Sequence, residues 1–198
     1  MKQIQKTPDH GMSKLSPIGA KYFKFIEFDP DEELLIEVRK HWFGMFLIFL
    51  AGFFVGGSVL LASFALASGN FLSSVGADSM RPFVALGGFL FTVVVIALTL
   101  VFAYLYQSNV VFVTNEKIAQ VLYLSIFNRK ISQLNIGDVQ DVTVKQNGFF
   151  AHVFHYGTLV VETAGEQQNY TFNYVPEPHN VARTIITSHE ANLKQYGN

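Results

Sequence analysis

Two long apolar segments stand out from the alternating pattern of this chain. Residues 42–67 and 82–107 contain no Lys, Arg, Asp, Glu or His. A helix rises about 1.5 Å per residue, so each segment can cross the roughly 30 Å hydrocarbon layer of a bilayer. A core helix of a soluble protein presents a polar face with a period of 3.6 residues, and neither segment does. The pattern therefore predicts a transmembrane hairpin over residues 42–107, with a short outside loop at 68–81.

After residue 107 the hydrophobic positions change to a period of two, which is typical of β-strands. Turn-forming pairs such as Asn115–Glu116 and Asn147–Gly148 separate six short strands. The predicted strands are 110–114, 117–125, 130–134, 139–146, 158–163 and 169–175. Pro178 suits the first turn of a helix whose apolar stripe continues to about residue 193. The segment between the fourth and fifth strands is expected to be irregular or one helical turn.

These elements predict an α+β membrane protein. The hairpin is followed by an antiparallel β-sandwich or barrel over residues 108–198, capped by the C-terminal helix. In the last strand, Tyr170, Phe172 and Tyr174 are expected to share one face. Residues 1–28 carry Pro, Gly and Lys without a period and are expected to be flexible.

The segment before the first apolar stretch also alternates, because Ile36 and Val38 are separated by charged neighbours. Residues 29–41 are therefore interpreted as a pre-membrane strand with a basic flank. Such a strand can pair with the later sheet only when both ends of the hairpin lie on one side of the membrane. Whether this pairing forms is left open by the sequence.

Basic residues indicate the orientation of the hairpin. They directly precede the first segment, whereas the loop 68–81 holds only Arg81. Both termini are therefore expected to be cytosolic, and three aromatic residues form a belt at the inner interface. The expected membrane-interface residues are Arg39, Lys40, Trp42, Tyr104 and Tyr106.

Small residues recur inside the apolar segments. Gly52 and Gly56 form a small-xxx-small face in the first segment, and Gly87 and Gly88 lie in the second. Close approach of helices in lipid requires such residues. One interpretation is self-association of two copies; the other, which we favour, is packing of the two segments against each other.

Composition narrows the function classes. The chain has 198 residues, of which 50% are hydrophobic and only 15% charged, and its net charge of −1 disfavours nucleic-acid binding. The absence of cysteine excludes disulfides and thiolate metal sites. The apolar segments hold no ionisable residue, which argues against a pump or carrier.

Motifs for catalysis and metal binding are weak. His152 and His155 are three residues apart, which on a helix places both on one face, but aromatic packing explains them better than zinc. Asp138 and Asp141 are expected to fall on opposite faces of a strand, which defeats a shared carboxylate site unless a bulge intervenes. No catalytic residue, metal or cofactor is expected.

Several short pieces, in this order around a two-helix hairpin, resemble the bacterial pleckstrin-homology-like, membrane-flanked domain family. An acidic-then-apolar lead precedes the first span, and a glycine-led strand and a closing strand follow later. The pieces are Asp31-Glu32-Glu33-Leu34-Leu35, Phe112–Ile118, Ile136–Val142, Tyr156–Thr163 and Phe172–Pro178. The resemblance covers roughly residues 30–190. The richness of Phe149–His155 in aromatics and histidine departs from the family pattern.

The resemblance implies a PH-like fold at the bacterial inner membrane, no established catalytic activity, and a binding or scaffolding role. Phosphoinositide-binding PH domains cluster Lys and Arg at the first hairpin. Here that hairpin has Lys117 alone, beside Glu116, so no phosphoinositide headgroup is expected.

The sequence thus favours a membrane-anchored binding or scaffold protein that is not an enzyme. Its expected partners are the lipid bilayer and an unknown protein or a second copy of the chain. The candidate partner surface is the aromatic stretch, with Phe149, Phe150, His152, His155 and Tyr156. Two alternatives remain: an accessory subunit of a transport or envelope complex, and a small enzyme acting on a lipid headgroup.

Overall fold

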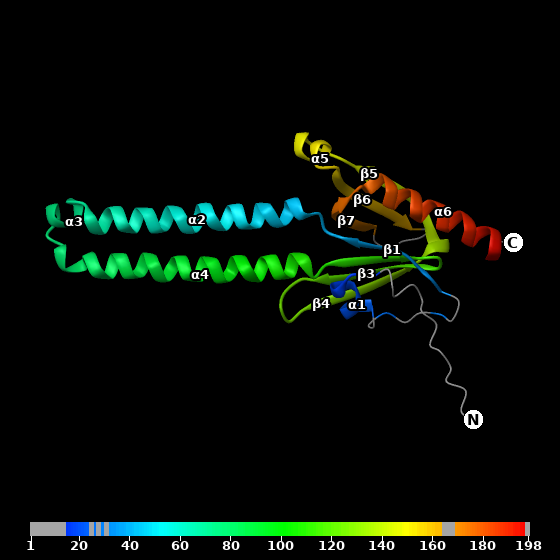
Figure 1. The fold of residues 1–198 in the computed structure, drawn as a ribbon, viewed down its shortest axis with the longest axis horizontal. Helices are drawn as coiled ribbons and strands as arrows, with labels where there is room; N and C mark the ends of the chain where they lie inside the picture. The colour runs from blue at the N-terminus through cyan, green and yellow to red at the C-terminus, as the bar shows by residue number, and fades with distance from the viewer. Residues whose placement is uncertain (1–14, 24–25, 27–28, 30–31, 164–168, 197–198) are drawn as a thin grey trace, which may run out of the picture. The chain divides into compact units, whose positions relative to one another are not determined.

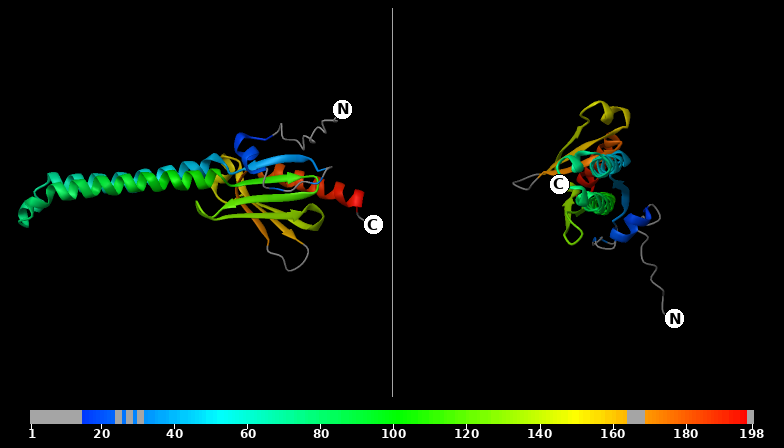
Figure 2. Two further views of the ribbon diagram at one scale, coloured as in Figure 1. Left: turned by 90° about the horizontal axis from the view of Figure 1, so that it is seen from below. Right: turned by 90° about the vertical axis from the view of Figure 1, so that its left-hand side faces the viewer.

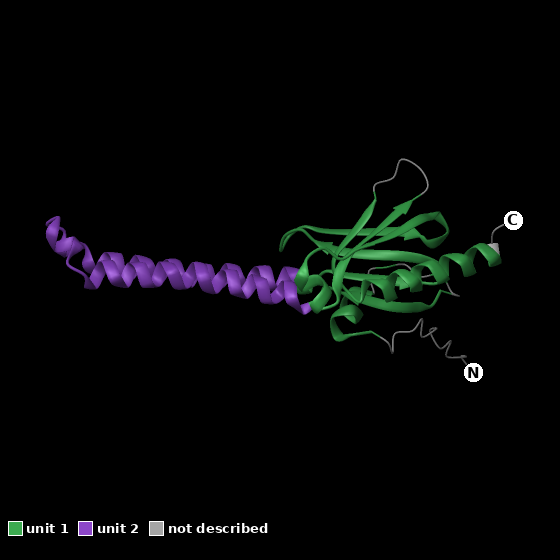
Figure 3. Cartoon of the chain, turned by 90° about the horizontal axis from the view of Figure 1, so that it is seen from above, with its two compact units in different colours: residues 1–41, 107–198 green, residues 42–106 purple. Residues whose placement is uncertain are grey.

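The computed structural model describes residues 15–23, 26, 29, 32–163 and 169–196. The chain divides into two compact units, coloured separately in Figure 3. One unit is residues 42–106. The other combines residues 1–41 with residues 107–198, so it is built from segments on both sides of the first in the sequence.

The smaller unit consists of two long helices and a short connection. Helix α2 (Trp42–Ser68) and helix α4 (Arg81–Gln107) are joined through α3 (Phe71–Ser74) and the 3₁₀ turn η2 (Asp78–Met80). Both long helices are long and apolar enough to span a membrane, with mean hydropathy 2.4 and 2.7 in their most apolar stretches. Only 6% of each of these stretches is buried, unlike the core helix of a soluble protein. The two short helical turns in the connection were not predicted.

Glycines lie where α2 and α4 contact each other. A Cβ atom at Gly52 would overlap the side chain of Thr99, and one at Gly88 would overlap Ser63. A Cβ atom at Gly56 would lie 3.5 Å from Cγ1 of Val95. Gly87 has no described neighbour within 4 Å, because adjacent helical residues point about 100° apart. The structure therefore places Gly52, Gly56 and Gly88 in this contact and leaves Gly87 out of it.

The larger unit contains two antiparallel sheets (Figures 1 and 2). The first has the order β1-β2-β3-β4 and the second β5-β6-β7. The strands are β1 (Leu34–Arg39), β2 (Val110–Thr114), β3 (Lys117–Tyr123), β4 (Arg129–Asn135), β5 (Val139–Lys145), β6 (Tyr156–Thr163) and β7 (Tyr170–Pro176). Strand β1 pairs with β2, Arg39 lying opposite Val110, so the pre-membrane segment joins the later sheet. The predicted α+β class is confirmed, but the two sheets do not close into a barrel.

One apolar core joins both sheets to the C-terminal helix α6 (Pro178–Tyr196). Its centre includes Ile118 from the first sheet, Leu159 from the second and Ile185 from α6. Each is at most 1% exposed, and burying such a side chain contributes roughly 1.5–3 kcal/mol. Helix α6 packs on β5, β6, β1 and the 3₁₀ turn η3 (Ile136–Asp138). The α6 helix therefore closes one side of this core, as the sequence predicted.

A second core lies under a helix that the sequence did not predict. Helix α1 (Pro17–Phe23) buries Tyr22 and Phe23 in a cluster with Phe112 and Val121 of the first sheet. Ser16 Oγ donates to Glu37 at 2.6 Å and fixes the start of the helix. The expectation of a flexible segment is therefore wrong for residues 15–23, whereas residues 1–14 lie outside the described chain.

Strand β7 departs from simple alternation. The β6–β7 register shifts between Gly157 and Leu159, and Tyr174 adopts a φ of 58°. Val175 is consequently buried, while the Tyr174 ring stacks on Tyr156 with centroids 5.4 Å apart. The prediction that Tyr174 shares the face of Phe172 is wrong, because a β-bulge moves one residue out of step.

The glycine contacts predict different effects for two adjacent substitutions. Replacing Gly88 with Ile should destabilise the packing of α2 on α4 by about 1–3 kcal/mol, because the new side chain overlaps Ser63. Replacing Gly87 with Ile should change stability little, because that position is open. Denaturant unfolding of the full-length protein in detergent micelles measures both, and equal losses would contradict the assignment.

Candidate functional site

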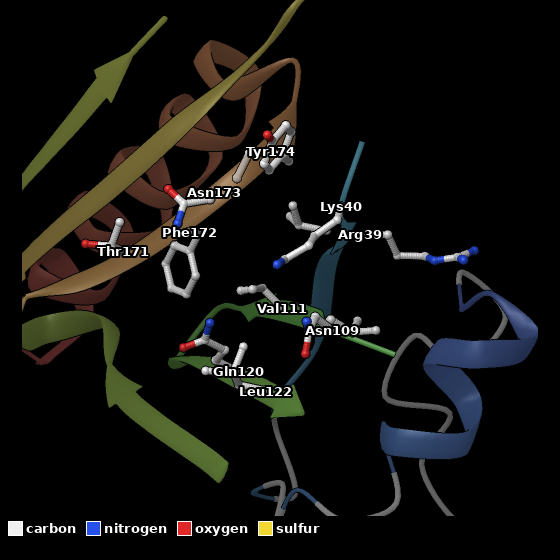
Figure 4. Close-up of a pocket in the computed structure, with 13 residues that line it drawn as sticks. Arg39, Lys40, Asn109, Val111, Gln120, Leu122, Thr171, Phe172, Asn173 and Tyr174 are labelled. Carbon is white, nitrogen blue, oxygen red and sulfur yellow. The ribbon is translucent and has the colours of Figure 1, made fainter. Parts of the chain in front are cut away.

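A cleft of about 180 Å³ opens between the two sheets (Figure 4). Strands β1, β2 and β3 form one wall and β7 forms the other. Val38, Val110 and Phe172 supply buried apolar surface, and polar side chains line the rest. The polar lining residues include Asn109, Gln120, Thr171 and Asn173. An apolar pocket with a few polar groups that converge on it is the usual form of a ligand site.

Two neighbouring basic residues take opposite directions at the edge of this cleft. Both residues line the cleft, but the Lys40 side chain points into the space between the sheets, whereas the Arg39 side chain points away from it (Figure 4). Successive residues of an extended chain point to opposite faces, which explains the difference at the end of β1. Burial lowers the pKa of Lys40 because desolvation disfavours the charged ammonium. The cleft thus contains a partly buried cation whose charge an anionic group would stabilise.

His41 ties the end of β1 to the second sheet. Its backbone N–H donates to the Tyr174 carbonyl at 2.6 Å, and its buried ring lies 5.3 Å from that of Tyr156. Desolvation lowers the pKa of His41, and a hydrogen bond to the Phe154 backbone opposes only part of this effect. The residue directly before α2 is therefore anchored by both β6 and β7.

The predicted partner surface is only partly contiguous. Phe149 and Phe150 are exposed on the short helix α5 (Phe149–Val153), with ring centroids 5.7 Å apart. His155 lies beyond the helix end with a φ of 54°, so it does not share a helical face with His152 as the spacing suggested. Tyr156 instead packs between His41 and Tyr174.

The residues predicted at the membrane interface fall into two groups. Arg39 and Lys40 belong to the larger unit, where Lys40 lines the cleft. In the helical unit, Trp42 and Tyr104 are exposed, while Tyr106 lies against Gly44. Sequence reasoning identified Lys40 as basic and near the membrane. The sequence around Lys40 did not predict the cleft, because the second wall of the cleft comes from β7, about 130 residues later in the chain.

The hairpin between β2 and β3 holds an internal ion-pair cluster. Lys117 Nζ lies 2.9 Å from fully buried Glu32 and 3.5 Å from Asp29. Glu32 also accepts a hydrogen bond from Thr114 Oγ1 at 2.6 Å. Desolvation lowers the pKa of Lys117, but the hydrogen bond and charge of Glu32, aided by Asp29, outweigh it and raise the pKa overall. The single lysine of this hairpin is therefore neutralised within the domain.

The same cluster brings the carboxylates of Asp29, Glu32 and Glu116 within 4.8 Å of one another. Three carboxylates at that spacing are able to hold a cation, but Lys117 already occupies the position of the counter-charge. Burial, followed by the charges of Glu32 and Asp29, raises the pKa of Glu116. The cluster is best described as a structural ion-pair network.

Comparison with known proteins gives one match. A family model described as a bacterial PH domain matches residues 45–188. No curated protein and no solved structure matches the chain. The match begins inside α2, so it leaves out α1, which contributes to the second core, and β1, which contributes to both cores.

The lowered pKa of His41 predicts that acid destabilises the larger unit. The folded state binds the proton less well than the unfolded chain, so the free energy of unfolding should fall as pH drops below about 6.5. Replacing His41 with Phe keeps an aromatic ring beside Tyr156 and removes the titration. Thermal unfolding of both full-length proteins between about pH 7.5 and pH 5 measures the difference. An identical pH dependence in the two would rule out this role for His41.

Proposed function

We propose that this chain, which belongs to the bacterial PH domain family, is a membrane-anchored binding or scaffold protein of the bacterial inner membrane. The main observation behind this proposal is that β1, which precedes the two long helices in the sequence, pairs with β2, which follows them. A single PH-like domain is thereby assembled from the residues before and after an apolar hairpin.

The apolar hairpin supports the membrane anchor. Most of the surface of α2 and α4 is exposed and apolar, which costs free energy in water and gains it in lipid. Each Leu, Ile, Val or Phe at the centre of a span contributes roughly −0.3 to −0.6 kcal/mol to insertion, and no charged residue opposes this between Trp42 and Ser68.

Strand pairing supports the orientation. Strand β1 leads into α2, and α4 leads into β2. Because β1 and β2 pair with each other, the chain between them must cross the bilayer an even number of times. Both ends of the chain then lie on one side. Arg39 and Lys40 precede α2 directly, whereas Arg81 is the only basic residue between positions 68 and 82. This bias favours the cytosolic side for both termini.

The cleft at Lys40 is the proposed binding site. The lining combines the Lys40 side chain with amide and hydroxyl side chains and with apolar residues, a combination that suits a ligand with one anionic group and an apolar body. None of the residues that line it is a carboxylate or a histidine, the side chains most often used for general acid–base catalysis. This lining supports the proposed binding role.

The ion pairs of Lys117 bear on the class of ligand. A PH domain that binds a phosphoinositide needs cations that face the solvent at its first hairpin. Here Lys117 is held by Glu32 and Asp29, and Glu116 adds a further acid. This arrangement supports the proposal that the domain does not use the β2–β3 hairpin to bind inositol phosphates.

The orientation predicts which positions a membrane-impermeant reagent reaches. Because the chain contains no cysteine, single variants such as Val75→Cys and Glu190→Cys report one site each. In intact spheroplasts, a charged maleimide should label Val75→Cys fully and should label Glu190→Cys only after lysis. Labelling of Glu190→Cys before lysis would contradict cytosolic termini.

The cleft predicts a difference between two adjacent basic residues. Native mass spectrometry of the full-length protein from mild detergent should detect bound molecules or proteins on the wild type. Lys40→Met should lose most of that occupancy because its charge faces the cleft, and Arg39→Met should retain it because Arg39 points away. An unchanged occupancy in Lys40→Met, or a wild type with nothing bound, would count against the cleft as the ligand site.

A further inference from the structure

Strand register locates the end of the larger unit to which both long helices are attached. Asn109 follows the last residue of α4 by two positions, and its Oδ1 accepts a hydrogen bond from the Tyr123 N–H at 2.7 Å. His41 precedes α2 by one position and lies against Tyr156. Consecutive Cα atoms are 3.8 Å apart, so Tyr123 and Tyr156 lie close to the helix ends whatever direction the helices take. We call this region the attachment end.

The turn between β3 and β4 extends from the attachment end. Tyr123 pairs with Arg129, and the turn between them is closed by the Leu124 N–H, which donates to the Asn128 carbonyl at 2.9 Å. Phe127 is 98% exposed at its tip, and Leu124 and Ile126 are also exposed. Three large apolar side chains on one tight turn form a contiguous apolar patch. Such a patch marks an interaction site, whereas single exposed apolar residues do not.

A second apolar tip extends from the same end. Helix α5 finishes three residues before Tyr156, which contacts His41. Phe149 is 76% exposed, and Phe150 and Val153 are also exposed. Within the larger unit, α5 and the β3–β4 turn therefore both lie at the end where β1 finishes and β2 begins (Figure 1).

Charge is distributed unequally along the strands of the domain. Basic residues gather at the attachment end. Among the described residues, Glu177 is the acidic exception there, because its backbone N–H donates to the His155 carbonyl. The basic residues are Arg39, Lys40, Arg129, Lys130 and Lys145. Acidic residues gather at the opposite end, around Thr114 and Ile136, where Lys117 is a basic residue paired with Glu32 and Asp29. The acidic residues there are Asp29, Glu32, Glu33, Glu116 and Asp138.

We propose that the attachment end is a lipid-contacting face. Phe127 and Phe149 enter the boundary between headgroups and acyl chains of the anionic leaflet, and Arg129, Lys130 and Lys145 lie against lipid phosphates. Exposed aromatic and aliphatic side chains bordered by basic residues are the combination that binds such an interface. The acidic end then faces away from the negatively charged surface. This inference rests on the membrane anchor proposed above, and it assigns Phe149 and Phe150 to lipid rather than to a protein partner.

Single spin labels test this face directly in a chain without native cysteine. Phe127→Cys and Phe149→Cys place nitroxides on the two tips. Gln133→Cys places one on an exposed mid-strand position of β4, as a matched control, and Leu61→Cys places one on α2. The full-length variants are reconstituted into nanodiscs of phosphatidylglycerol and phosphatidylcholine, and nitroxide collisions with oxygen and with a water-soluble nickel chelate are measured.

The labels at 127 and 149 should collide with oxygen several-fold more often, relative to nickel, than the label at 133. Replacing both Arg129 and Lys130 with Glu should reduce this ratio at position 127. If the label at 61 reports lipid while those at 127 and 149 report water, the lipid-contacting face is wrong and the anchor stands. If the label at 61 reports water, the membrane anchor itself fails. Tips shielded from both reagents would indicate a protein partner and would also overturn the proposal.

Discussion

The hydrogen-bonded pairing of β1 with β2 is the constraint on which the rest of this structure depends. The two strands are separated by residues 40–109, and closing a flexible loop of that length costs several kcal/mol of chain entropy. A helical hairpin that forms first brings its own ends together and removes most of that cost. In the proposed membrane-anchored state, insertion of the hairpin therefore prepares the pairing that completes the first sheet. In that proposed state, the same pairing would also determine which residues of the domain lie next to the bilayer.

Two lysines show how the domain uses buried charge. Lys117 is held by Glu32 and Asp29, and the net effect of its surroundings raises its pKa. Lys40 lines a cleft whose other charged lining residue is Arg39, and burial lowers the pKa of Lys40. The first arrangement stabilises the ammonium and joins the segment before β1 to the β2–β3 hairpin. The second disfavours the ammonium, and such a cost is typical of residues retained for binding.

Much of the fold could be predicted from the sequence because its strands alternate regularly and its turns contain strong signals. Strand β2 was predicted with the observed bounds, and α6 was predicted from Pro178 and its apolar stripe. Helix α1 was not predicted because seven residues are too few to display a helical period. The misplacement of Tyr174 arose from a bulge that depends on its partner strand. The cleft at Lys40 was unpredictable for a similar reason, since both of its walls are formed only by tertiary packing.

The hydrogen bond from His41 to Tyr174 has a mechanical consequence. Tyr174 belongs to the strand that forms one wall of the cleft, and His41 is covalently continuous with the first residue of α2. In the proposed membrane-anchored state, the residue next to the first span would thus be joined to the cleft wall by one short hydrogen bond.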